Sequence, residues 1–171
     1  MSRRWVLRPL SLQIIGTVTI FSHVDSMAAD RVDLPGGFRL GSSLNEAKRH
    51  AAATGWQLVA MPPELSGQWF VKEANIGVYV CDDAVASVTQ SSEGDLDGFA
   101  QLVFDLQMKR GEPKMQTASF MAGATRISNI DARFAEVDGV GVAVQLSSTA
   151  GRLTISTNYF SDTCADSRRE R

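Results

Sequence analysis

The sequence predicts an α+β protein in which a helix followed by several antiparallel strands occurs twice in succession. Two segments, 43–54 and 95–110, have apolar residues at helical spacing, and short runs of alternating apolar residues follow each of them. We therefore expect two units at residues 29–93 and 94–164, with a charged tail at 165–171. The sequence leaves open whether the strands of the two units form one sheet or two.

Residues 1–28 have the three parts of a secretory signal peptide. Three arginines stand in the first eight residues, an apolar run occupies residues 10–21, and Ser26-Met27-Ala28 ends in small residues. The apolar run is shorter than the roughly 20 residues that a membrane-spanning helix needs. We expect cleavage near Ala28, a periplasmic or secreted mature protein, and no stable membrane insertion.

The export route is left open. Residues 2–8, Ser-Arg-Arg-Trp-Val-Leu-Arg, resemble the twin-arginine signal. They differ from its consensus at two positions, where this chain has Val6 instead of Phe and Arg8 instead of Lys. An ordinary export signal with adjacent arginines is the alternative interpretation.

The mature chain is weakly acidic and poor in residues that catalyse reactions. After removal of residues 1–28, 14 basic and 18 acidic residues remain, and His50 is the single histidine. This charge argues against a nucleic-acid partner, because such proteins carry basic patches. One histidine and two cysteines are too few for the usual zinc ligand sets, and no serine motif accompanies His50. We assign no catalytic residue, no metal and no cofactor.

Ser43-Leu44-Asn45-Glu46 is a capping box, which predicts the start of the first helix. Gly55 is placed to end this helix, and Leu44, Ala47 and Ala51 give it a narrow apolar face. His50 stands beside two cations, so we expect it at the solvated surface. Strands are predicted after this helix at 56–61, 68–72, 76–81 and 85–90, and a turn at Asp82-Asp83 joins the last two.

Asp95 can cap the second helix and Gly111 can end it. Asp138-Gly139 is a strong hairpin signal between strands predicted at 130–137 and 140–146. A further strand is predicted around 153–159, after a looser turn at 148–151. The apolar stripe of the second helix consists of Leu96, Phe99, Leu102, Val103 and Leu106.

Two sets of residues are candidates for specific roles. Cys81 and Cys164 can pair in only one intramolecular way, and export favours a disulfide that stabilises the fold; two free thiols are the alternative. Trp56, Trp69 and Phe70 are candidate anchors for a partner, because aromatic residues dominate interface energetics, although they could instead fill the core.

Two acidic segments suggest weaker alternatives. Residues 93–98 resemble the first half of a calcium-binding EF-hand loop, but Phe104 stands where the loop needs a glutamate. An acid-capped helix start explains the same residues. Asp82-Asp83 could serve glycoside hydrolysis, but adjacent acids in a turn more often face water.

The segment 40–47, Leu-Gly-Ser-Ser-Leu-Asn-Glu-Ala, followed by Gly55, resembles a helix opening in the BamE/SmpA-like and β-lactamase-inhibitor-like group of exported bacterial domains. Residues 109–113, Lys-Arg-Gly-Glu-Pro, resemble the helix exit of the same group. The resemblance implies helices packed on a small antiparallel sheet, sometimes in tandem, and binding to other proteins. The lipid-bearing cysteine of the outer-membrane members is missing here.

The sequence thus predicts an exported, non-enzymatic protein that binds a protein partner. A carboxylate-dependent hydrolase or a small-ligand-binding protein is the alternative, and a calcium-stabilised module is a third. The identity of the partner and the oligomeric state are left open.

Overall fold

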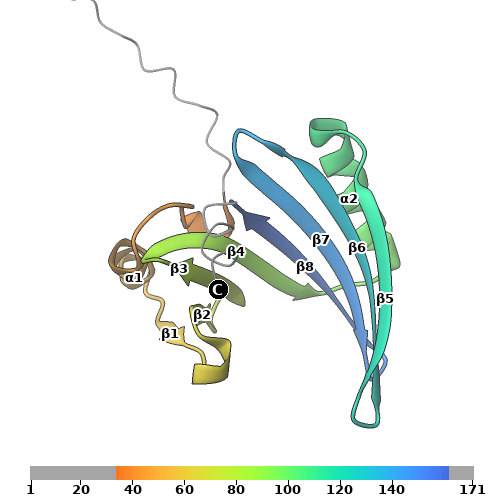
Figure 1. The fold of residues 1–171 in the computed structure, drawn as a ribbon, viewed down its shortest axis with the longest axis horizontal. Coiled ribbons are helices and arrows are strands. Elements are labelled where there is room, and N and C mark those ends of the chain that lie inside the picture. Colours follow the sequence, from red (N-terminus) through yellow and green to blue (C-terminus); the bar gives the residue numbers. More distant parts are fainter. Residues whose placement is uncertain (1–33, 162–171) are drawn as a thin grey trace, which may run out of the picture.

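The computed structural model describes residues 34–161 and shows them as one eight-stranded antiparallel sheet with two α-helices (Figure 1). This agrees with the α+β class, and it answers the question of one sheet or two, because all eight strands lie in one sheet. The predicted signal peptide (1–28), the charged tail (165–171) and Cys164 lie outside the described residues.

The elements occur in the order helix, four strands, helix, four strands. Short 3-10 turns at Pro35–Gly37 and Pro63–Leu65 accompany the first half. The helices are α1 (Leu44–Ala53) and α2 (Leu96–Arg110). The strands are β1 (Leu58–Ala60), β2 (Gln68–Val71), β3 (Ile76–Cys81), β4 (Ala84–Glu93), β5 (Lys114–Ala122), β6 (Thr125–Val137), β7 (Val140–Thr149) and β8 (Arg152–Phe160).

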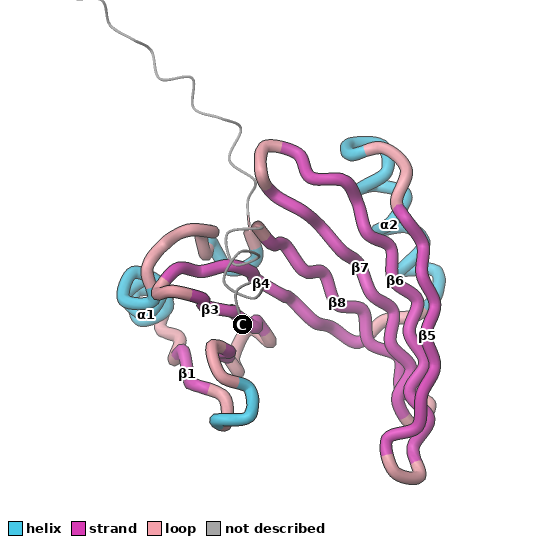
Figure 2. Tube along the Cα trace, viewed as in Figure 1, coloured by secondary structure: helices cyan, strands magenta, loops and turns pink. Residues whose placement is uncertain are grey.

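The strand order is β1-β2-β3-β4-β8-β7-β6-β5, so β4 and β8 pair at the centre and the other strands run outward to the two edges (Figure 2). This central pair runs from Ser87 opposite Phe160 to Glu93 opposite Thr154. Because β4 and β8 are the fourth and last strands, the sheet is joined across its middle by residues far apart in the sequence.

Type I′ turns close three of the hairpins. Asp82 and Asp83 have φ values of 50° and 62°, Asp138 and Gly139 have 52° and 74°, and Ala150 and Gly151 have 50° and 81°. The turn predicted to be looser at 148–151 is therefore a tight two-residue turn between Thr149 and Arg152. Both central residues of a type I′ turn need positive φ, and its twist matches that of the flanking strands. The predicted hairpin at Asp138-Gly139 is therefore confirmed, with Val137 opposite Val140.

Both helices cover the same face of the sheet, each over a core of its own. Ala47 and Ala51 of α1 belong to one buried cluster with Val71, Ile76, Val78 and Val88, and Phe99 of α2 belongs to another with Ala132, Phe134, Val142, Val144 and Leu146. Tyr159 of β8 packs against both clusters, which places the helices on one side. We call the opposite side of the sheet the open face.

The predicted helix starts are confirmed. The Ser43 N–H donates to Glu46 Oε2 at 2.8 Å, and the Glu46 N–H donates to Ser43 Oγ at 3.3 Å. The hydrogen bond from the Ser43 backbone lowers the pKa of the Glu46 carboxyl below 4.5. Asp95 Oδ1 accepts from the Gly98 N–H at 2.8 Å, which satisfies a free donor of the first turn of α2.

Three further expectations from the sequence were wrong. Strand β5 was not predicted, because its sequence lacks alternation and all nine of its residues are exposed. Leu96, predicted in the buried stripe of α2, is 57% exposed. His50 is half-buried rather than solvated. Its Nε2 lies 2.6 Å from the Gly36 carbonyl oxygen, and its ring packs edge-on against Phe38.

Tyr159 makes the stability dependent on pH in alkaline solution. Burial raises the pKa of its phenol above 10.0, against an opposing effect of Arg110. A raised folded-state pKa means that the contribution to stability is complete below pH 10 and is lost as the pH rises through the folded value. We expect urea unfolding of Tyr159→Phe to show a smaller loss of stability between pH 9 and pH 11 than the wild type shows. Equal losses in both proteins would contradict this.

Candidate binding surface

The open face is covered by no helix within residues 34–161, since α1 and α2 both lie on the other side. Successive residues of a strand point to opposite faces, so the neighbours of the buried residues Val78, Val88 and Val144 point to the open face. In the central strands these neighbours are mostly serine, threonine, asparagine and glutamine. They are Ser87, Thr89, Ser91, Ser156, Asn158, Gln145, Ser147, Asn129 and Asp131.

Hydrogen bonds join these polar side chains across the strands. Thr89 Oγ1 donates to Asn158 Oδ1 at 2.9 Å, and the hydroxyls of Ser91 and Ser156 lie 2.8 Å apart. Both contacts cross the central pair β4–β8. The surface is therefore ordered by its own contacts before any ligand arrives.

A second pair of contacts orders the β6–β7 side of the open face. Gln145 Nε2 donates to Asp131 Oδ1 at 2.7 Å, and Ser147 Oγ donates to Asn129 Oδ1 at 2.9 Å. The Arg133 guanidinium lies 5.4 Å from the centre of the Phe160 ring. The charged residues of this side are thus engaged with neighbours on the same face.

A hollow of about 400 Å³ lies on the open face over β2, β3 and β4. Gly77 lies opposite Phe70 on β2 and Thr89 on β4, so the missing side chain leaves the hollow open between them. A Cβ added at Gly77 would meet nothing closer than Thr89, at 3.9 Å. The lining holds Gln68, Trp69, Phe70, Asn75, Gly77, Val78, Tyr79, Ser87, Thr89 and Ser91, with no Asp, Glu, Lys, Arg or His among its residues.

The ring of Tyr79 forms one wall of this hollow, and the Gly67 backbone packs against it. A Cβ added at Gly67 would lie 3.0 Å from the Tyr79 ring, so the ring packs against the Gly67 backbone. The Asn75 side chain is also fixed, because its Nδ2 donates to the Ser91 carbonyl oxygen at 2.6 Å. Aromatic and amide groups therefore stand in set positions around the hollow.

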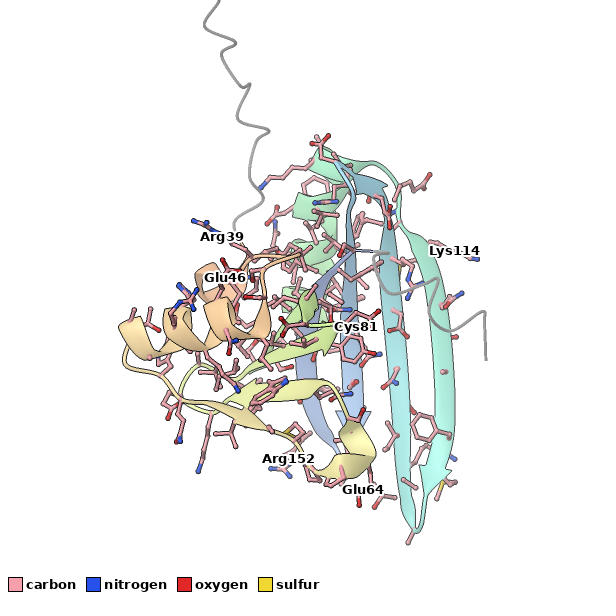
Figure 3. The ribbon with its side chains drawn as sticks, turned by 60° about the vertical axis from the view of Figure 1, so that its left-hand side comes forward. Arg39, Glu46, Glu64, Cys81, Lys114 and Arg152 are labelled. Atoms are coloured by element: carbon pink, nitrogen blue, oxygen red, sulfur yellow. The ribbon has the colours of Figure 1, made fainter. Side chains whose placement is uncertain are left out.

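A second hollow, of about 360 Å³, lies between α1 and the segment before it. It is lined by charged residues, including Arg39, Glu46 and Arg49, and Arg39 and Glu46 lie on the same side of the molecule (Figure 3). His50 also lines it, but its Nε2 faces the Gly36 carbonyl. A carbonyl only accepts, so this nitrogen donates its proton to Gly36 and is not placed as a base.

Of the three aromatic residues predicted as anchors, Trp69 and Phe70 line the hollow and Trp56 does not. Trp56 and Trp69 pack against the cluster under α1, and the Lys48 ammonium lies 4.3 Å from the Trp69 ring centre. Phe70, the next residue along β2, points to the open face and lines the hollow. The sequence did not single out Gly77 or Tyr79. The alternation of small and polar residues with valines at 76–91 was the only signal for them.

The acidic segments have structural roles. Asp82 and Asp83 are the exposed central residues of the β3–β4 turn, and Glu93 to Gly98 spans the end of β4 and the cap of α2. Among the described residues no three His, Cys, Asp or Glu side chains gather as metal ligands would. Within residues 34–161, every helix is too short or too polar to cross a membrane.

Cys81 is the last residue of β3, opposite Ala84 (Figure 3). The last described residue, Ser161, donates its N–H to the Ala86 carbonyl oxygen at 3.0 Å. The chain therefore leaves the described part close to the hairpin that carries Cys81. Because Cys164 lies outside the described residues, the disulfide stays a prediction.

Comparison of the chain with protein-family models, with curated proteins and with solved structures gave no match.

Proposed function

We propose that this chain is the precursor of an exported, non-enzymatic protein that binds a protein partner through the hollow on the open face. The observation that carries the proposal is the uncharged hollow floored by Gly77, set in a polar surface that is already hydrogen-bonded. Ordered surfaces bind more tightly because little side-chain entropy is lost on association.

The chemistry of the hollow defines what the partner presents. Phe70 and Tyr79 offer aromatic surface, and the hydroxyl and amide groups of Thr89 and Asn75 offer hydrogen bonds. No charged residue lines the hollow, so we expect a partner loop that inserts an uncharged side chain. Affinity should then depend little on salt, since surface charge pairs are what salt screens.

The order of the elements supports the finer description of the fold as two helix-plus-meander units. Each unit ends in a central strand, β4 or β8, and the two pair side by side. The hollow lies on the first unit, and Asn158 and Ser156 of the second unit continue its polar rim through Thr89 and Ser91. In this proposal, pairing of the units extends the binding surface beyond the hollow itself.

Filling the hollow tests the proposal. Gly77 is in ordinary strand conformation with free space above it, so Gly77→Ala and Gly77→Val should fold normally. We expect a partner captured from envelope extract, then purified, to bind Gly77→Ala more weakly than wild type. Binding to Gly77→Val should fall by at least about tenfold in titration calorimetry, equivalent to roughly 1.4 kcal/mol.

Ala135→Val, on an exposed position of β6, is the matched control and should bind like wild type. Unchanged affinity of Gly77→Val would show that the partner binds elsewhere. Failure of wild-type protein to capture any partner, at low and high salt alike, would contradict the proposal as a whole.

A small neutral ligand is the second candidate, because a hollow of about 400 Å³ lies within the size range of ligand sites. Such a ligand would raise the melting temperature of the wild type and not that of Gly77→Val. A carboxylate-dependent hydrolase has no comparable support, since no Asp or Glu lines this hollow.

A further inference from the structure

Strand β5 is a long edge with an unpaired side. It stands last in the sheet order, pairs with β6 only, and exposes all nine of its residues. Along its outer edge the backbone N–H and C=O groups have no strand partner within residues 34–161. Such an edge is a template for another strand, and proteins normally protect it.

The opposite edge of the sheet shows that protection, and β5 does not. Prolines stand near both edge strands, Pro62-Pro63 after β1 and Pro113 before β5, so the difference lies in length: β1 has only three residues and β5 has nine. Strand β5 contains no proline, no glycine and no bulge against β6, and its single charge, Lys114, stands at its first position (Figure 3). Its exposed apolar side chains, Met115, Phe120 and Met121, are 50%, 50% and 59% exposed. The unprotected edge thus also exposes apolar side chains.

The sequence of β5 complements itself when two copies are placed antiparallel. A two-fold axis through Ala118 sets Met115 opposite Met121 of the second copy, and Thr117 opposite Ser119. Side chains directly opposite each other on neighbouring antiparallel strands interact, and two like charges in such a pair would be destabilising. Lys114 falls opposite Ala122, so no like charges meet.

We propose that β5 is the interface with a second copy of this chain, which pairs through β5 to form a continuous sheet of two molecules. A two-fold axis perpendicular to the sheet keeps the helices of both copies on one side and the open faces on the other. The two Met115–Met121 pairs lie on the helix side, because Met115 lies opposite the buried Ala132 of β6. This interface uses none of the residues that line the hollow, so it does not depend on the proposed function.

The residue on the axis provides the test. Only in this register does Ala118 lie opposite Ala118 of the second copy. Because Ala118 is exposed, a charged side chain at this position is tolerated in the monomer. Sedimentation velocity of the mature protein, from about 1 to 100 µM, should show twice the monomer mass. Ala118→Lys and Ala118→Glu should each weaken the dimer by at least about tenfold through like charges on the axis. Mixing the two variants should restore it, since Lys then meets Glu.

Ala60→Lys, on the exposed β1 edge, is the control and should remain a dimer. A wild-type protein that stays monomeric throughout would overturn the proposal. So would a dimer that survives Ala118→Lys, or variants that stay monomeric when mixed. Hydrogen exchange of the unmodified protein gives a readout that needs no variant. Amides of residues 114–122 should exchange more slowly at high than at low concentration, and equal rates would also overturn the interface.

Discussion

Replacing Ile76 with alanine is expected to lower the free energy of unfolding by about 2–5 kcal/mol. Ile76 is the largest fully buried side chain of the sheet and is 1% exposed. Its Cδ1 would lie 2.7 Å from a Cβ built on Gly36, so it reaches the backbone of the turn at Pro35–Gly37. Truncation leaves a cavity under that turn, and His50 and Phe38 hold the turn in place so that it cannot collapse.

Urea unfolding followed by circular dichroism measures this change. Val59→Ala is the matched control, because Val59 lies on β1 and is 49% exposed. We expect the control to stay within about 1 kcal/mol of wild type. A loss for Ile76→Ala no larger than that of the control would contradict the close packing described here.

Loss of the predicted Cys81–Cys164 disulfide is expected to cost about 4–5 kcal/mol, because the bond would close a loop of more than eighty residues. Ser161 lies beside Ala86, and the three residues to Cys164 span at most about 10 Å. Cys81 lies opposite Ala84 in the same hairpin, so the geometry of the described chain allows the bond.

Unfolding of the mature protein with and without reductant measures the effect. The double variant Cys81→Ala, Cys164→Ala is the control, and reductant should leave its stability unchanged. Two titratable thiols in the folded, unreduced protein would contradict the disulfide directly, whatever the stability.

Local signals in the sequence were sufficient for most elements. The capping box at Ser43, the cap at Asp95 and the Asp138-Gly139 turn act through contacts within a few residues, and the structure confirms all three. Strand β3 was predicted with its correct bounds, since the alternation of Ile76, Val78 and Val80 reflects a buried face.

What the sequence could not predict depends on contacts over long distances. Strand β5 has no buried face and hence no alternation, and β6 is its strand partner in the sheet. Leu96 has the correct spacing for the buried stripe, but it lies in the first turn of α2, beyond the part that packs on the sheet. The hollow at Gly77 forms only when β2 and β4 flank β3.

The central pair of strands has a consequence for the order of folding. Strand β4 needs β8 as its neighbour, and contacts such as Thr89 to Asn158 join residues 69 positions apart. Loop closure over that distance is slow, so this pairing should come late. During synthesis this edge of β4 stays open until β8, Arg152–Phe160, has emerged. The buried cluster under α1 lies within residues 34–88, so we expect a chain truncated before β8 to keep this cluster while leaving one edge of β4 unpaired and open to other strands.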